Sequence, residues 1–258
     1  MDLNAIAAAA AQGENQTLVN TKTERKIPEA GMAFAVLKDY IELGVHNKTG
    51  NYTGTERKLM LTFELNHKKH LVEGEPQLFT VRVNITNSEK GKFLPLFNAL
   101  NYDNRAQHMT QLIGRKFLVE LTHVKKGDKT YVNADKNGAW TFRSPIYEDP
   151  ATGDQRDLTA QIPNLKGDPR VFIWENAAIS DKDYLDMWNS VFIESNNFIQ
   201  EIIRTNIDFN TSRLSTLLNG VSTEDINDVV NNVVTNNNTN NNQPEEGYEV
   251  QQDFEPDF

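Results

Sequence analysis

The feature that most constrains the fold is a regular alternation of side chains in two stretches of chain. In residues 59–65 every second residue is leucine or phenylalanine, and residues 79–85 repeat the pattern with phenylalanine, valine and isoleucine. A period of two belongs to a β-strand with one buried face, because successive side chains point to opposite sides. Residues 32–45 predict a third, longer strand, which can bend or bulge at Gly44. The chain is therefore expected to fold around a β-sheet.

Residues 114–142 predict a β-hairpin, because two runs rich in β-branched and aromatic residues flank the turn signal Gly127-Asp128. Before it, apolar residues between positions 93 and 113 recur at helical spacing, and Gly114 suits a helix C-cap. The order is thus three strands, a helix and two strands. This is the arrangement of the OB-fold, a five-stranded Greek-key barrel that binds oligonucleotides across strands two and three and the loops one–two and four–five. We predict a mainly β fold of this type with helical additions.

Four regions are predicted along the chain. Residues 1–30 form a flexible N-terminal arm, 31–146 the barrel, 147–220 an extension with amphipathic helices, and 221–258 a disordered asparagine-rich linker with an acidic tail. Ser180 and Asp183 predict the start of a helix whose apolar stripe runs to Ile202, and a shorter helix is predicted to stop at Gly220. The stripe leaves two interpretations open, packing against the barrel or a homodimer interface. Eight of residues 231–242 are asparagine, too polar to bury a core.

The charge is distributed unevenly along the chain. The formal net charge is −10, yet residues 22–145 carry a net charge of +7 and residues 146–258 a net charge of −15. A basic middle beside acidic flanks is expected of a nucleic-acid binder with an acidic interaction tail. Chance clustering is the alternative explanation.

Composition excludes several classes of protein. The chain has no cysteine, which excludes disulfides and thiolate metal sites and favours a reducing cytoplasm. Its five histidines lack the spacing of paired metal ligands, so neither a metal nor another cofactor is expected. No apolar run approaches the roughly 18 to 20 residues that cross a bilayer, so no membrane association is expected.

The candidate DNA-binding residues are cations or flat aromatic side chains on the predicted strands and loops. Rings stack on unpaired bases at roughly 1 to 3 kcal/mol per base, and cations follow the phosphates. The alternative is that the aromatic residues are core, the lysines protect an edge strand, and Arg82 forms a cross-strand ion pair. The candidates are Lys48, Tyr52, Arg57 and Lys58 around the first hairpin loop, Arg82 on the third strand, Lys125, Lys126 and Lys129 at the second hairpin tip, and Tyr131, Trp140, Phe142 and Arg143 beyond it.

Residues 243–258 contain six acidic residues and no basic ones, and the chain ends Asp-Phe-Glu-Pro-Asp-Phe. With the expected barrel and linker, this end resembles the phage-type single-stranded DNA-binding proteins, whose acidic tail ends in phenylalanine. The resemblance implies DNA binding without catalysis, in phage replication, recombination and repair, in the cytoplasm of an infected bacterial host. It also implies a tail that competes with DNA and recruits replication or recombination proteins, such as a polymerase or helicase-primase, through Asp253, Phe254, Glu255, Asp257 and Phe258.

Two other functions are weighed against this one. A metal-dependent nuclease would use the carboxylates clustered in residues 148–157 and 181–186, although a solvated loop and a helix N-terminus also account for them. An OB-fold adaptor or virion component would bind protein instead of DNA, with the long helix and the tail as its working parts.

Overall fold

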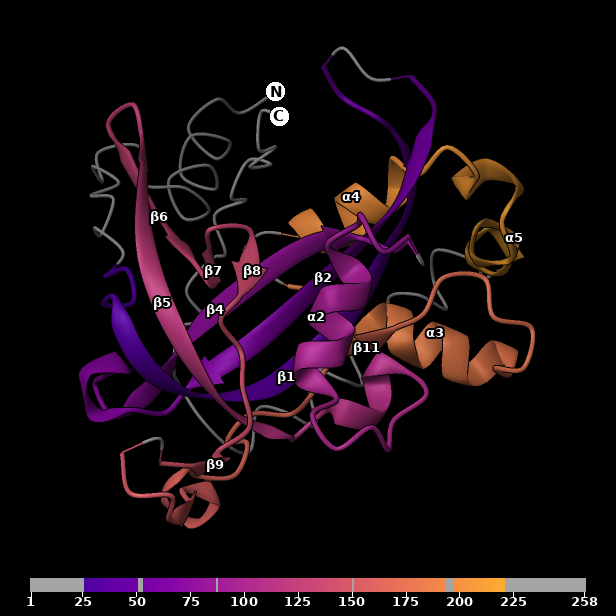
Figure 1. Ribbon diagram of the computed structural model, residues 1–258. Helices are drawn as coiled ribbons and strands as arrows, with labels where there is room; N and C mark the ends of the chain where they lie inside the picture. The colour runs from indigo at the N-terminus through magenta and orange to yellow at the C-terminus, as the bar shows by residue number, and fades with distance from the viewer. Residues whose placement is uncertain (1–25, 51–52, 87, 150, 194–196, 221–258) are drawn as a thin grey trace, which may run out of the picture.

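The structure is a computed structural model that describes residues 26–50, 53–86, 88–149, 151–193 and 197–220 (Figure 1). The predictions for residues 1–25, for Tyr52 and for the linker and acidic tail lie outside the described residues. Within them, the predicted class is confirmed: a mainly β protein, with a curled half-barrel sheet and four helices.

The sheet has the strand order β3-β4-β2-β1-β5-β6, and a further strand, β11, runs parallel to β1. Among the described residues no pairing joins β4 to β6, so the sheet curls without closing. The strands are β1 Gly31–Asn47, β2 Thr55–Leu65, β3 Leu71–Val72, β4 Glu75–Asn84, β5 Lys116–Lys126, β6 Lys129–Asn133 and β11 Val171–Phe172.

The bend predicted at Gly44 is confirmed. The pairing of β1 with β2 slips between Glu42 and Gly44, and Gly44 has a φ of +91°, which favours glycine. A Cβ atom at Gly44 would lie 1.8 Å from Nδ2 of Asn206, so the helical extension approaches the strand closely here. The bulge therefore lies where the extension packs against β1.

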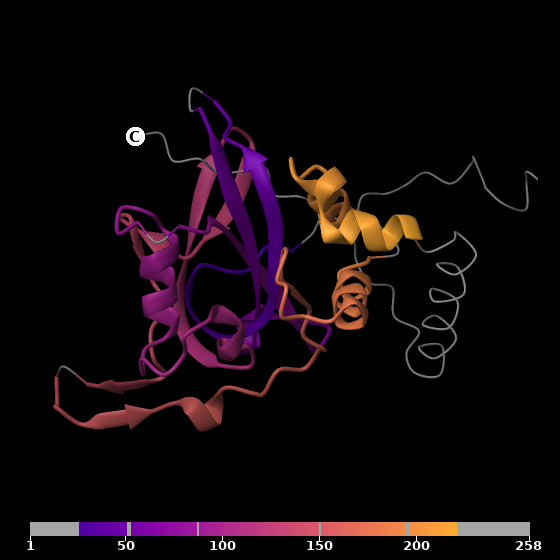
Figure 2. The ribbon, with the colours of Figure 1, turned by 90° about the vertical axis from the view of Figure 1, so that its right-hand side faces the viewer.

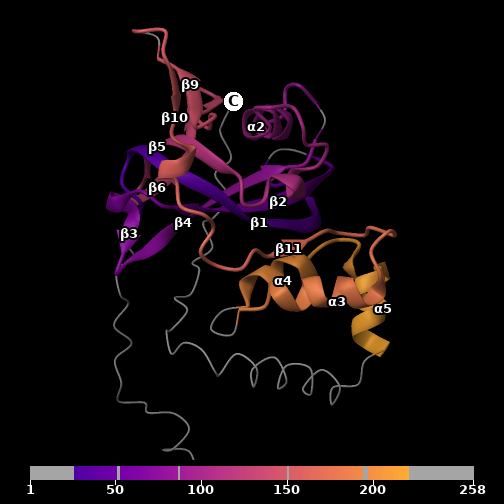
Figure 3. The same ribbon diagram turned by 90° about the horizontal axis from the view of Figure 1, so that it is seen from below.

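The two faces of the central strands pack against different layers. Leu59, Leu61 and Phe63 point into an inner cluster with α2 (Phe93–Leu100), whereas Met60 joins an outer cluster with the later helices. Figures 2 and 3 show α2 on one side of the sheet and α3, α4 and α5 on the other. The later helices are α3 Asp181–Ser190, α4 Phe198–Arg204 and α5 Arg213–Gly220.

The prediction of one long amphipathic helix was wrong, because α3 ends at Ser190 and α4 begins only at Phe198. The predicted start of this helix was correct: Ser180 caps α3, and its hydroxyl accepts a hydrogen bond from the Asp183 amide at 3.1 Å. Val191, the C-cap of α3, and Ile193 are buried in the outer cluster, so tertiary packing rather than helical periodicity sets the course of the chain here. The apolar residues of both helices still reach one cluster, through two segments instead of one.

The predicted last strand was also too long. β6 ends at Asn133, and the chain then forms a small hairpin of β7 (Asp135–Lys136) and β8 (Ala139–Trp140). A second hairpin, β9 (Ile146–Glu148) with β10 (Gln155–Asp157), extends away from the sheet (Figure 2).

Three buried carboxylates on β1 and β2 attach the extension to the outer face of the sheet. Asp39, Glu42 and Glu64 are 0%, 4% and 2% exposed. Buried charges need donors, and here backbone amides of the extension supply some of them. The Lys166 and Gly167 amides donate to Glu64, the Arg170 amide to Asp39 and the Trp174 amide to Glu42.

Candidate nucleic-acid interface

The hairpin predicted at Gly127-Asp128 is confirmed, and its tip carries three exposed lysines. Lys126 lies directly opposite Lys129, and Val124 directly opposite Tyr131. Because facing residues two apart along a strand share a face, Tyr131, Lys126 and Lys129 lie on one face of this lysine hairpin and Lys125 on the other. Within the described chain, Lys125 and Lys129 make no ion pair.

The β1–β2 hairpin lies beyond the Asn47 end of β1, and the lysine hairpin lies beyond its Gly31 end. Because β1 is strongly curled, both hairpins point the same way in Figures 1 and 2. The Lys48 amide donates to the Gly54 carbonyl at 3.0 Å, which closes the loop, and the Lys48 side chain is exposed. The curl of β1 thus turns two basic hairpins, far apart in the sequence, toward one side of the molecule.

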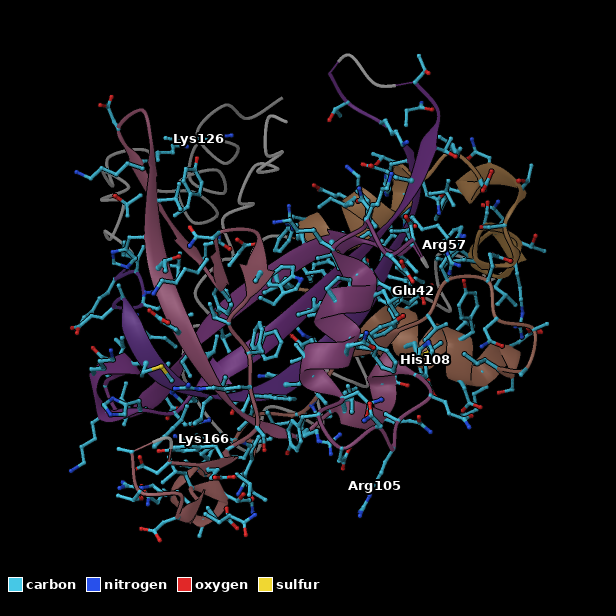
Figure 4. All side chains as sticks on the ribbon, in the orientation of Figure 1. Glu42, Arg57, Arg105, His108, Lys126 and Lys166 are labelled. Carbon is cyan, nitrogen blue, oxygen red and sulfur yellow. The ribbon has the colours of Figure 1, made fainter. Side chains whose placement is uncertain are left out.

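At the base of the β1–β2 hairpin the cations are held by carboxylates. Arg57 Nη2 lies 3.0 Å from Glu42 Oε2, and the Tyr40 hydroxyl donates to Glu42 Oε1 at 2.7 Å (Figure 4). Burial, together with the charge of Glu42, raises the pKa of Tyr40 well above its ordinary value, so this hydroxyl stays a donor. Lys58 Nζ lies 3.4 Å from Glu56 Oε1. Arg57 and Lys58 therefore differ from Lys125 and Lys129 of the lysine hairpin, since both already have anionic partners.

Arg82 and Arg143 lie apart from the hairpin tips. Arg82 is partly buried on β4 and pairs in register with Met60, which places it on the outer face of the sheet. Arg143 bridges to Leu118, well down β5 from the tip, and its guanidinium lies 5.9 Å from the centre of the Tyr147 ring.

The two aromatic candidates after the hairpin are adjacent, with ring centroids 6.5 Å apart, but they differ in exposure. Phe142 is 5% exposed and packs at 4.6 Å on the Phe63 ring, so the structure places it in the core and leaves no face of its ring for a base. Trp140 is half-buried, and its Nε1 donates to the Lys92 carbonyl at 2.9 Å. Lys92 Nζ also lies 5.8 Å from the Trp140 ring centre. The sequence pattern alone could not separate these two rings.

The acidic clusters named in the sequence lie on the surface and have basic neighbours. Asp149 pairs with Arg156 at 2.6 Å, Asp186 with Lys182 at 2.6 Å, and Asp181 with Arg213. Among the residues that the structure describes, no group of three or more histidines, aspartates and glutamates is placed to hold a metal ion. None of the described helices is both long and apolar enough to span a membrane.

Comparison with known protein families gives no match for this chain, and a search among curated proteins finds no similar sequence either.

Proposed function

We propose that this protein binds single-stranded DNA with little sequence preference, and that the lysine hairpin is the main contact. The observation that carries the proposal is the hairpin tip itself, where Lys125, Lys126 and Lys129 are all exposed. Exposed cations of this kind can follow the phosphates of a single strand. Tyr131, on the same face as Lys129, offers a ring for stacking.

The arrangement of the sheet supports an OB-type barrel as the framework. β1, β2, β4, β5 and β6 would be its five strands, with α2 between the third and fourth. The β1–β2 and β5–β6 hairpins then correspond to the loops that flank the oligonucleotide groove of this fold.

The wider role proposed for the protein follows the resemblance of its last residues. It acts without catalysis in phage DNA replication, recombination and repair, in the cytoplasm of the host. The tail of residues 243–258, outside the described residues, recruits replication proteins and competes with DNA for the basic surface. Tethering would raise the local concentration of the tail near that surface.

The test is fluorescence anisotropy of labelled oligo-dT over a salt series. One variant replaces Lys125, Lys126 and Lys129 with glutamine, and a matched control replaces Lys68, Lys166 and Lys182, three lysines on neither hairpin. Each phosphate contact on a single strand contributes about 0.7 to the slope of log affinity against log salt, so the first variant should lower that slope by about 2. The control keeps the wild-type slope, although its net charge falls equally.

Four results would count against the proposal. Equal loss in both variants would show that only net charge matters, and unchanged binding in the first would exclude the lysine hairpin. If the unmodified chain does not bind oligo-dT, the protein-binding adaptor becomes the better candidate. Degradation of the oligonucleotide that depends on added Mg²⁺ would instead favour the nuclease.

A further inference from the structure

Two cavities meet at the base of the β1–β2 hairpin. Each has a volume of about 370 Å³, and both are lined by Val45 and Arg57. The first opens toward the helical extension and includes Glu175 and Asp208. The second opens toward the end of β4 and includes Lys48, which we use to name it the Lys48 pocket.

The charges of the two cavities suit different ligands. In the first, two carboxylates accompany Arg57, so an anion would meet net negative charge. The carboxylate of the Lys48 pocket belongs to Glu56, which is already engaged by Lys58 at 3.4 Å and by Asn84 Nδ2 at 2.6 Å. Lys48 itself makes no ion pair within the described residues. Only the Lys48 pocket therefore fits an anionic group.

The guanidinium of Arg57 is held in place at the pocket by a buried network. Glu42 is 4% exposed and accepts hydrogen bonds from Arg57 at 3.0 Å, from the Tyr40 hydroxyl at 2.7 Å and from the Trp174 amide at 3.1 Å. An arginine carries five N–H donors, and this contact uses one of them. The Arg57 side chain is 50% exposed, so its other donors remain accessible. Donors fixed in this way need little ordering when a ligand arrives.

The remaining walls provide an apolar surface and neutral polar groups. Val45 and Ile85 are aliphatic, while Asn84 and Thr86 supply an amide and a hydroxyl. The volume lies in the lower part of the range of about 300 to 1,000 Å³ for small-ligand sites. A ligand with one phosphate and one flat, largely apolar ring system matches these walls.

We propose that the Lys48 pocket holds one nucleotide of the bound strand, with its phosphate at Lys48 and Arg57 and its base against Val45 and Ile85. Glu42 and Tyr40 are positioning residues that orient Arg57. This inference rests on the proposed function and extends it, because it gives the strand a fixed end point beyond the lysine hairpin. The bound DNA strand would then run from the lysine hairpin to the Lys48 pocket at the base of the β1–β2 hairpin.

The test compares deoxythymidine monophosphate (dTMP), thymidine and inorganic phosphate as probes, using NMR shift titration of the full chain. Wild type should bind dTMP more tightly than thymidine or phosphate, with shifts in residues 45–57 and 84–86. Lys48→Ala removes an exposed charge contact and should lower the dTMP-to-thymidine affinity ratio about twofold to fivefold. Lys68→Ala, at the opposite end of β2, is the control and should keep the ratio.

Tyr40→Phe tests the positioning role separately. It should lower the dTMP-to-thymidine ratio while thymidine affinity stays constant, which a general loss of packing would not do. An unchanged dTMP-to-thymidine affinity ratio would show that Tyr40 does not position Arg57.

The outcomes separate this inference from the proposed function. Oligo-dT binding combined with no dTMP shifts in the pocket, or with an unchanged ratio in Lys48→Ala, would overturn the pocket and leave the function standing. Binding of dTMP that is sensitive to Lys48 without any binding of oligo-dT would support the pocket and reject the function. If the protein binds neither dTMP nor oligo-dT, the pocket and the proposed function are both rejected.

Discussion

The pair of Asp39 and Arg170 allows a sharp test of how the extension is attached to the sheet. Asp39 is 0% exposed, and Arg170 gives it three hydrogen bonds: its amide at 3.0 Å, Nε at 3.3 Å and Nη2 at 2.8 Å. Arg170→Ala removes the two side-chain bonds and the compensating charge. Breaking a buried ion pair from one side costs about 3 to 5 kcal/mol. The backbone bond survives, so we expect a cost of about 3 kcal/mol, near the lower limit of that range.

Urea unfolding measures this cost, with fluorescence of Trp174 and Trp188 in the outer cluster as the probe. With a dependence on urea of about 2 kcal/mol per molar, the midpoint should fall by about 1.5 M. The matched control is Arg156→Ala, which breaks the pair with Asp149, where the arginine side chain is 54% exposed. Exposed pairs contribute about 0 to 1 kcal/mol, so the control should unfold nearly as wild type does.

A second variant tests whether the uncompensated charge is the cause. Asp39→Asn combined with Arg170→Ala removes the buried charge itself and should recover part of the lost stability. The reasoning is refuted if Arg170→Ala unfolds within about 1 kcal/mol of the Arg156→Ala control, the most that an exposed pair contributes.

Two further predictions concern the outer layer. Burial raises the pKa of Tyr184 to about 12 from its ordinary 10.0, so its contribution to stability is complete below pH 10 and is lost as the pH rises toward 12. Urea unfolding between pH 9 and 12 should show this loss in wild type and a smaller one in Tyr184→Phe. The Gly44→Ala variant should have a lower melting temperature than the Gly54→Ala variant. Both glycines have positive φ, but only a Cβ atom at Gly44 would meet Asn206. The expected difference is about 1 to 3 kcal/mol, as for overpacked cores, and equal melting temperatures would contradict the close approach.

The elements that the sequence predicted well are those set by neighbouring residues. The alternation in residues 59–65 required a strand because a period of two matches only that backbone. Gly127-Asp128 fixed the lysine hairpin, and Ser180 with Asp183 fixed the start of α3. Each signal is a local preference, complete within a few residues, so it can be recognised without knowing the rest of the fold.

The tertiary structure decided what each residue faces. Trp140 and Phe142 look alike in the sequence, yet Phe142 is buried against Phe63, next to the bridge that joins Arg143 to Leu118 of β5. Asp39 and Glu42 are buried although they are acidic, because the extension, more than a hundred residues later, donates its backbone amides to them.

For the candidate DNA-binding residues too, some features follow from the local sequence and others from the tertiary structure. The sequence alone determined that cations gather in two hairpins, because charge and turn signals are local. Only the tertiary structure turned these hairpins toward one side, through the curl of β1, and gave Arg57 its buried partner Glu42 through the pairing of β1 with β2. Pairing between distant strands depends on the whole core, which no short stretch of sequence encodes.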